Sequence, residues 1–282
     1  MKIGFNLLLW TTQVGEEHYP ILEALKATGY DGVEVPIFAG EVPDYARLGR
    51  VLKDLALEAT AVTVLPDEAH SAVSADAASR EGALDHLKWA VDCLAACGGD
   101  LLAGPYHQPL GVFTGETPSA AERDRLVEIG ARAADYALAA GIRLSLEPLN
   151  RFECYVLNTV ADAAEIVRRV NRPNYGLLYD TFHANIEEKD PVGVIAPHLR
   201  WINHVHIAEN DRGTPGRGHV PLAATLAALK AGGYDGWLVI EAFGRALPAL
   251  AAATRVWRDF FPNPEQVYRE GFTALRDGWA LA

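Results

Sequence analysis

Residues 231–243 read AGGYDGWLVIEAF, which joins the end of a helix, a glycine turn and the start of an apolar strand. The glycines suit the left-handed cap of a helix, and Asp-Gly makes the turn into the strand. The phrase GYDG also occurs at residues 29–32, again directly before a β-rich run. This recurrence indicates a chain built from repeated helix-to-strand junctions.

Eight β-rich runs follow one another along the 282 residues, separated by longer segments with helical spacing. Eight repeats in 282 residues give about 35 residues for each run and the segment after it, the size of one βα unit. The expected strands are Ile3–Leu9, Gly32–Ile37, Ala59–Leu65, Asp100–Pro105, Arg143–Leu149, Gly176–Thr181, Ile202–Ala208 and Trp237–Phe243. The expected helices include Glu17–Thr28, Ser79–Ala96, Ala120–Ala140, Ala161–Val170 and Thr225–Ala231.

Several of these runs are apolar on both alternating faces, as in TAVTVL and WLVIEAF. Such runs are typical of parallel strands covered by helices. Eight units in fewer than 300 residues favour an α/β fold of one (β/α)₈ TIM barrel over an open doubly wound sheet. We expect one domain over residues 1–282, with residues 263–282 forming an extra C-terminal helix packed on the barrel.

Composition and charge exclude several classes of protein. Half of the residues are hydrophobic, which excludes a disordered or collagenous chain. The net charge of −12 argues against a nucleic-acid partner, because that binding depends on Lys and Arg at phosphates. An acidic cleft suits a divalent cation or a neutral substrate instead.

Cysteine usage and the N-terminus suggest where the protein works. The three cysteines, Cys93, Cys97 and Cys154, form no spaced disulfide framework, and we expect Cys93 and Cys97 to be small core residues. The N-terminal stretch lacks the features of a signal peptide, and no stretch reaches the ~18 apolar residues of a membrane span. We therefore expect a cytoplasmic protein that does not associate with membranes.

Four consecutive expected strands, the fifth to the eighth, end in side chains that can bind a metal ion. These side chains are Glu147, Asp180, His206 and Glu241, spaced by about one βα unit. In a TIM barrel the active site lies at the C-terminal ends of the strands, so the four would converge there. Buried carboxylates need compensation, and a divalent cation supplies it. Three carboxylates and one imidazole suit Mn²⁺, Mg²⁺ or Co²⁺ better than a structural zinc.

Four segments carry a resemblance to a known family. They are LEPLNRFE (146–153), LLYDTFHANIEE (177–188), HVHIAENDRGTPGRGHVP (204–221) and GYDGWLVIEAF (233–243). Together they resemble the D-tagatose 3-epimerase / D-psicose (allulose) 3-epimerase group of the xylose isomerase-like TIM barrels. The likeness extends over nearly the whole chain but is specific only in its C-terminal half. The segments VPIFAGEVPDY (35–45) and AGPYHQPLGVFTG (103–115) depart from that group.

The resemblance implies a ketose 3-epimerase that inverts C3 of a ketose through an enediolate. No cluster of Lys and Arg at the ends of the seventh and eighth strands marks a phosphate site, so we expect a free ketose. Glu147, Asp180, His206 and Glu241 match the metal ligands of the group, for one divalent cation per chain, with Mn²⁺ favoured over Mg²⁺ or Co²⁺. Glu147 and Glu241 also match the pair that moves the proton, and Glu153, His183 and Arg212 match positions that hold substrate hydroxyls. We expect a homo-oligomer, a dimer or a tetramer. The chemistry agrees, since inverting a carbon beside a ketone needs proton removal from one face and return from the other.

Other polar residues near the expected site are also candidates. Asn6 would line the pocket and contact substrate, and His107 would bind substrate or lie in a surface loop. His183 is a metal ligand or, in our preferred interpretation, a substrate contact. His204 belongs to the core or supports the site from behind, and Glu34 forms a hydrogen bond to substrate or pairs with an Arg or a Lys inside the barrel.

Three other reactions are compatible with the same scaffold. One is an aldose–ketose isomerase similar to hydroxypyruvate isomerase, with proton transfer between C1 and C2. Another is a dehydratase that acts on a keto-inositol or a related polyol. An endonuclease that acts at abasic sites in DNA is disfavoured by the net charge of −12.

Overall fold

Eight parallel strands close into a barrel in the computed structural model, which describes residues 1–282. Each strand pairs with its neighbours in sequence order, and β1 pairs with β8 to close the ring. The strands are β1 (Lys2–Asn6), β2 (Gly32–Pro36), β3 (Glu58–Val62), β4 (Leu101–Gly104), β5 (Arg143–Leu146), β6 (Tyr175–Asp180), β7 (Ile202–Ile207) and β8 (Trp237–Ile240). The predicted (β/α)₈ barrel is therefore confirmed.

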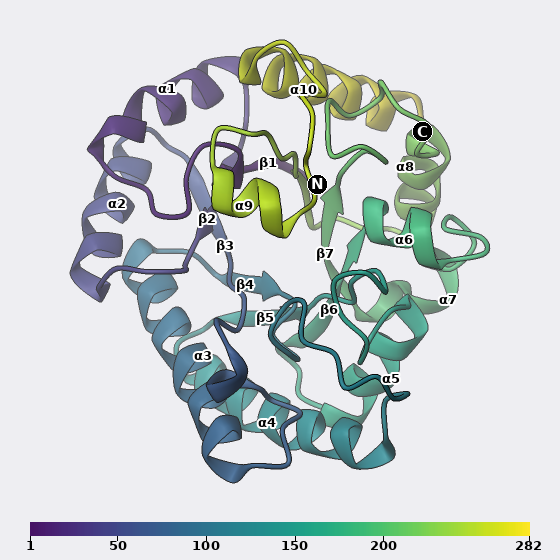
Figure 1. The fold of residues 1–282 in the computed structure, drawn as a ribbon. Helices are drawn as coiled ribbons and strands as arrows, with labels where there is room; N and C mark the ends of the chain where they lie inside the picture. Colours follow the sequence, from purple (N-terminus) through teal and green to yellow (C-terminus); the bar gives the residue numbers. More distant parts are fainter.

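Helices form an outer ring around the strands (Figure 1). Those that follow the strands in order are α1 (Tyr19–Thr28), α2 (Val42–Asp54), α3 (Ala77–Cys97), α4 (Ala120–Ala139), α5 (Val160–Val170), α6 (Thr181–Glu187), α7 (Ile195–His198), α8 (Leu222–Ala231), α9 (Pro248–Ala253) and α10 (Pro264–Leu281). Four short 3₁₀ helices are also present: η1 (Leu7–Leu9), η2 (Glu16–His18), η3 (Glu68–His70) and η4 (Leu199–Trp201). Viewed along the barrel axis, α9 crosses the open end of the barrel.

The two GYDG turns have the backbone that their sequence predicts. Gly29 ends α1 at φ 116°, and Gly233 follows α8 at φ 81°, both in the left-handed region that favours glycine. The predicted C-terminal helix is present as α10, which packs against α1, α8 and β1. Tyr30, beside the first turn, donates a hydrogen bond from its hydroxyl to the carbonyl oxygen of Tyr268 on α10.

The first strand is shorter than its apolar run. Strand β1 ends at Asn6, and Leu7–Leu9 form a 3₁₀ turn rather than the continuation expected to Leu9. The side-chain oxygen of Asn6 accepts a hydrogen bond from the backbone N–H of Leu8, which caps the turn and ends the strand. All three cysteines are buried and free, and Cys93 and Cys97 lie in the hydrophobic core, as expected. No helix in the structure has both the length and the apolar character needed to cross a bilayer.

Candidate active site

The four predicted strand-end residues meet at one end of the barrel. Asp180 is the last residue of β6 and His206 lies in β7, while Glu147 and Glu241 directly follow β5 and β8. His206 Nδ1 lies 3.6 Å from Asp180 Oδ2 and 3.4 Å from Glu241 Oε1. Glu147 and Asp180 form an overlapping group with His183, whose Nε2 lies 3.6 Å from Glu147 Oε1.

The donor atoms of this cluster suit a divalent cation. Asp180 Oδ2 and His206 Nδ1 are buried and have no hydrogen-bond partner, which is uncommon for polar atoms inside a protein. Both atoms face the carboxylates at the mouth, and carboxylate oxygens with one imidazole nitrogen are ligands for hard divalent ions. The residues present therefore fit the cation that the sequence predicts.

Burial sets the protonation of the carboxyl groups. It raises the pKa of Glu147 well above its ordinary value and the pKa of Glu241 to about 7. Burial acts in the same direction on Asp180, but His183, His206 and Arg212 outweigh it and hold the pKa of Asp180 below its usual range. In the absence of a cation, negative charge at this end of the barrel is therefore costly, and a bound cation would offset that cost.

Arg212 is the basic side chain that reaches into the cluster. It lies in the loop after β7 with φ 62°, a left-handed conformation uncommon for a residue other than glycine. Its Nη1 donates to Glu241, and its Nη2 lies 3.1 Å from His183 Nε2. The guanidinium packs over the rings of Phe182 and Phe243, 3.8 and 4.8 Å from their centroids, so its orientation is fixed.

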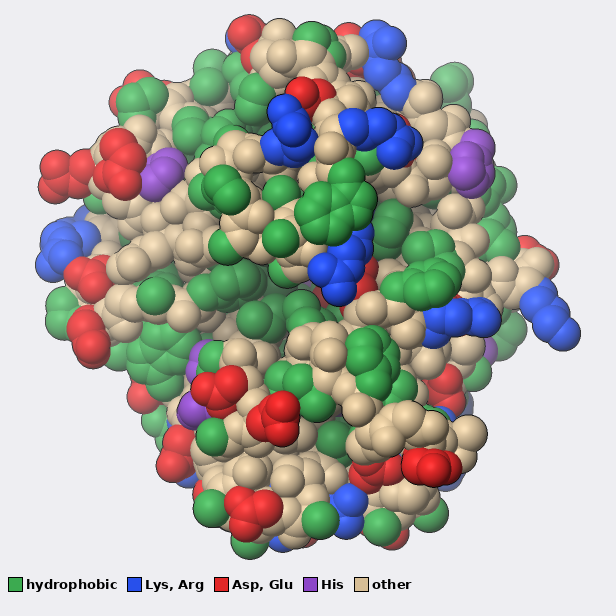
Figure 2. Space-filling model, viewed as in Figure 1, with side chains coloured by type: hydrophobic (Ala, Val, Ile, Leu, Met, Phe, Trp, Pro, Cys, Tyr) green, Lys and Arg blue, Asp and Glu red, His purple; other side chains and the backbone are tan.

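A cleft of about 160 Å³ opens above the cluster. Five ionisable side chains line it, namely Glu147, Glu153, His183, Arg212 and Glu241. The remaining wall is mostly apolar and comes mainly from the first half of the chain and from residues 243–254: Leu8, Phe38, Val62, Val64, Pro105, Leu110, Leu149, Phe243, Leu250, Ala253 and Thr254. Figure 2 shows hydrophobic side chains around the hollow at the centre of this face.

Asn150, inside the motif LEPLNRFE, holds two residues of this cleft, a role that the sequence did not predict. Its backbone N–H donates to His183 Nδ1 at 3.0 Å, and its side-chain amide donates to Glu153 Oε1 at 2.8 Å. These bonds fix the two cleft residues relative to each other. Its position three residues after Glu147 was the only signal in the sequence.

Two of the predicted substrate contacts lie outside the cleft lining. Asn6 is fully buried, and its side-chain amide donates to Glu34 Oε1 at 2.9 Å and to Glu241 Oε1 at 3.2 Å. His107 is also fully buried rather than in a surface loop, and burial lowers its pKa to about 3. Glu34 lies outside the cleft lining and contacts His204 and His206 rather than an Arg or a Lys.

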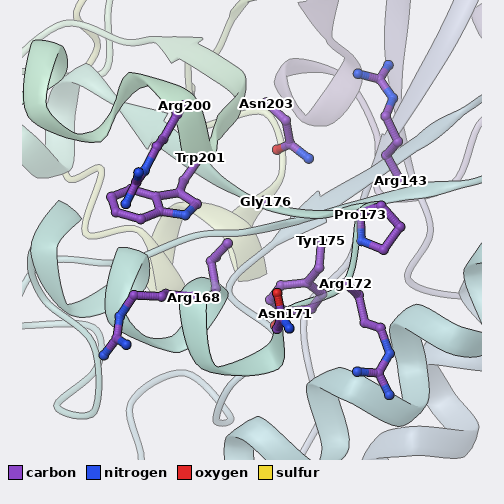
Figure 3. A pocket seen from close by; sticks show the side chains of 11 residues that line it. Arg143, Arg168, Asn171, Arg172, Pro173, Tyr175, Gly176, Arg200, Trp201 and Asn203 are labelled. Carbon is purple, nitrogen blue, oxygen red and sulfur yellow. The ribbon is translucent and has the colours of Figure 1, made fainter.

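A second cavity, of about 310 Å³, lies at the opposite end of the barrel (Figure 3). Its lining includes the N-terminal ends of β5, β6 and β7 and four arginines. Arg143 pairs with Asp100, Arg172 pairs with Asp135, and Arg200 stacks on Trp201, so these three side chains already have partners. The lining contains no carboxylate or histidine, so this cavity offers no general acid or base.

The comparisons with known proteins agree with this geometry. The family model described as "Xylose isomerase-like TIM barrel" matches residues 22–278. A probable ketose 3-epimerase of Synechocystis sp. is 32% identical over 98% of this chain and 96% of its own length. A ketose 3-epimerase of Arthrobacter globiformis is 33% identical over 98% of this chain and 96% of its own. The crystal structure of a D-allulose 3-epimerase from Methylomonas sp. in complex with D-allulose matches with a TM-score of 0.90 and 29% identity, over 98% of this chain and 96% of the other.

Proposed function

The chain belongs to the xylose isomerase-like TIM barrel family and is an isomerase-class enzyme, and we propose that it inverts C3 of a free ketose. One observation carries this proposal. Two buried donor atoms without partners, on Asp180 and His206, lie between glutamates that follow β5 and β8. This arrangement suits a cation flanked by two proton-transfer groups.

The two glutamates approach the cleft from different strands. Strands β6 and β7 separate β5 from β8 in the barrel, so Glu147 and Glu241 face the cleft from different sides. One carboxylate would remove the C3 proton and the other carboxylic acid would return a proton to the opposite face, which inverts the carbon. A divalent cation held by Glu147, Asp180, His206 and Glu241 would supply positive charge for the oxygens on C2 and C3.

The other polar residues of the cleft would bind and orient the sugar. Arg212 and His183 present nitrogen atoms, and Glu153 presents a carboxylate, so sugar hydroxyls would find both donors and acceptors. Arg212 is the only basic residue besides His183 in the lining, and its guanidinium is already bonded to Glu241. With no free cation for a phosphate, the cleft favours an unphosphorylated ketose.

The test is isotope incorporation from deuterium oxide. The Mn²⁺-loaded chain is incubated with a panel of ketoses and aldoses, including D-allulose and L-ribulose, and the products are assigned by NMR. Deuterium at C3 of an epimeric ketose is the expected result. Exchange at C1 or C2 with an aldose product would indicate the isomerase instead, and loss of water from a polyol ketone would indicate the dehydratase.

Further parts of the proposal concern the cation, the assembly and the domain. We propose one divalent cation per chain, with Mn²⁺ favoured over Mg²⁺ and Co²⁺, a homo-oligomer of two or four chains in the cytoplasm, and a single domain over residues 1–282. Elemental analysis of the protein purified in the presence of each metal ion measures how many cations each chain binds and which ion it prefers. Light scattering measures the mass of the assembly, and a single calorimetric unfolding transition is expected of a single domain.

A further inference from the structure

Behind the proposed cation site, a second group of polar side chains fills the barrel. Glu34 on β2 lies at its centre and is completely buried, as are His204 and His206 on β7. Glu34 Oε2 bonds His204 Nε2 at 2.7 Å and accepts from Thr60 Oγ1 at 3.2 Å. Glu34 Oε1 accepts from Asn6 at 2.9 Å and lies 2.7 Å from His206 Nε2.

Three hydrogen bonds and one close imidazole contact surround this carboxylate. An ionised carboxylate has about four lone-pair sites, and both oxygens of Glu34 are engaged by these groups. Glu34 therefore has no free oxygen for substrate, and its position under the cleft floor gives it no access to solvent.

The contact with His206 determines which ring nitrogen carries a proton. Nε2 lies 2.7 Å from Glu34 Oε1 without the alignment of a hydrogen bond, and a bare lone pair that close to a carboxylate oxygen would be repelled, so we infer that Nε2 carries a hydrogen. The other nitrogen, Nδ1, lies 3.6 Å from Asp180 Oδ2 and 3.4 Å from Glu241 Oε1 and also has no hydrogen-bond partner. The ring thus presents Nδ1 toward the proposed cation and Nε2 toward Glu34.

We propose that Glu34 is a positioning residue, which fixes His206 in the orientation and protonation that let Nδ1 bind the cation. The proposal rests on the cation site of the proposed function. The negative charge of Glu34 also makes the imidazole more basic and a better ligand. Asn6 extends the effect, because its amide bonds Glu34 and Glu241 together, so a ligand on β7 and a ligand after β8 depend on one carboxylate.

The first experiment measures cation affinity rather than turnover. Mn²⁺ is titrated into the metal-free chain, and free Mn²⁺ is followed by electron paramagnetic resonance for wild type, Glu34→Gln and Thr60→Val. Glu34→Gln keeps the shape but removes the charge, and we expect a Kd about 10–100-fold weaker. Thr60→Val is the matched control, because it removes one hydrogen bond to Glu34 without changing the contact with His206, and its Kd should equal that of wild type.

A second measurement needs no variant of Glu34, so it tests the role of Glu34 even if Glu34→Gln does not fold. NMR of the ¹⁵N-histidine-labelled chain reports the protonation of each ring, with His206 assigned by comparison with His206→Gln. We expect a protonated Nε2 on His206, with and without Mg²⁺. A bare Nε2, or Mn²⁺ affinity unchanged in a folded Glu34→Gln variant, would overturn the role of Glu34. Absence of Mn²⁺ binding by wild type would instead overturn the cation site and the proposed function.

Discussion

The affinity of the cleft for a divalent cation should fall steeply as the solution becomes more acidic. Glu241 has a pKa of about 7 because it is buried, so it keeps a proton that a cation must displace. A group with that pKa is about nine-tenths ionised at pH 8 and about one-tenth ionised at pH 6, so Glu241 alone weakens the apparent Kd about tenfold over this range. Glu147 and His206 also have raised pKa values and must also lose a proton, so they add to the effect in the same direction.

The assay is isothermal titration of Mn²⁺ into the metal-free chain at several pH values from 6 to 8. Repeating each titration in buffers of different ionisation enthalpy counts the protons released, and we expect at least one per cation at pH 6. Glu128→Gln is the control, because that carboxylate is on the surface of α4 and its loss should leave the pH dependence unchanged. A Kd that changes by less than about twofold between pH 6 and pH 8, without proton release, would refute the reasoning.

Three further predictions concern the residues of the cleft. Glu147→Gln and Glu241→Gln should each lower the rate of C3 inversion by ~10²-fold or more, measured by chromatography of the ketose products, because each removes a proton-transfer group. Arg212→Ala should lower the free energy of unfolding of the metal-free chain by about 2–3 kcal/mol, because Glu241 loses its charged hydrogen-bond donor. Urea denaturation measures this loss, and an unchanged midpoint would contradict the prediction. Mn²⁺ at 100 times its Kd should add about 2.7 kcal/mol to that free energy, and calorimetry should show the gain disappear after EDTA treatment.

The barrel was predictable because its pattern is repeated. Each apolar run between helical segments carries the same signal, and the glycine turns at residues 29–32 and 233–236 mark the junctions. The end of β1 was not predictable in this way, because Leu7–Leu9 continue the apolar run while the cap on Asn6 ends the strand. Short helices such as α6 and α9 contain too few turns to show helical periodicity.

The candidate site was predictable in part, for a reason of topology. The C-terminal ends of parallel strands meet at one mouth, so strand-end residues such as Asp180 and Glu241 had to converge. The pairing of Glu34 with His204 could not be predicted from the sequence, because it joins residues 170 positions apart across the inside of the barrel. That contact depends on how the strands are staggered when the ring closes, and hydrophobic pattern carries no information about stagger.

The hydrogen bond between Asn6 and Glu241 has a consequence for how the protein matures. It joins residues 235 positions apart, across the seam where β8 meets β1. A contact at that separation forms late, since the loss of chain entropy must first be offset by the strands between. A chain still on the ribosome therefore folds its early strands without any competent cleft. The cleft and its proposed cation would appear together when the last strand docks, so cation binding would report closure of the barrel.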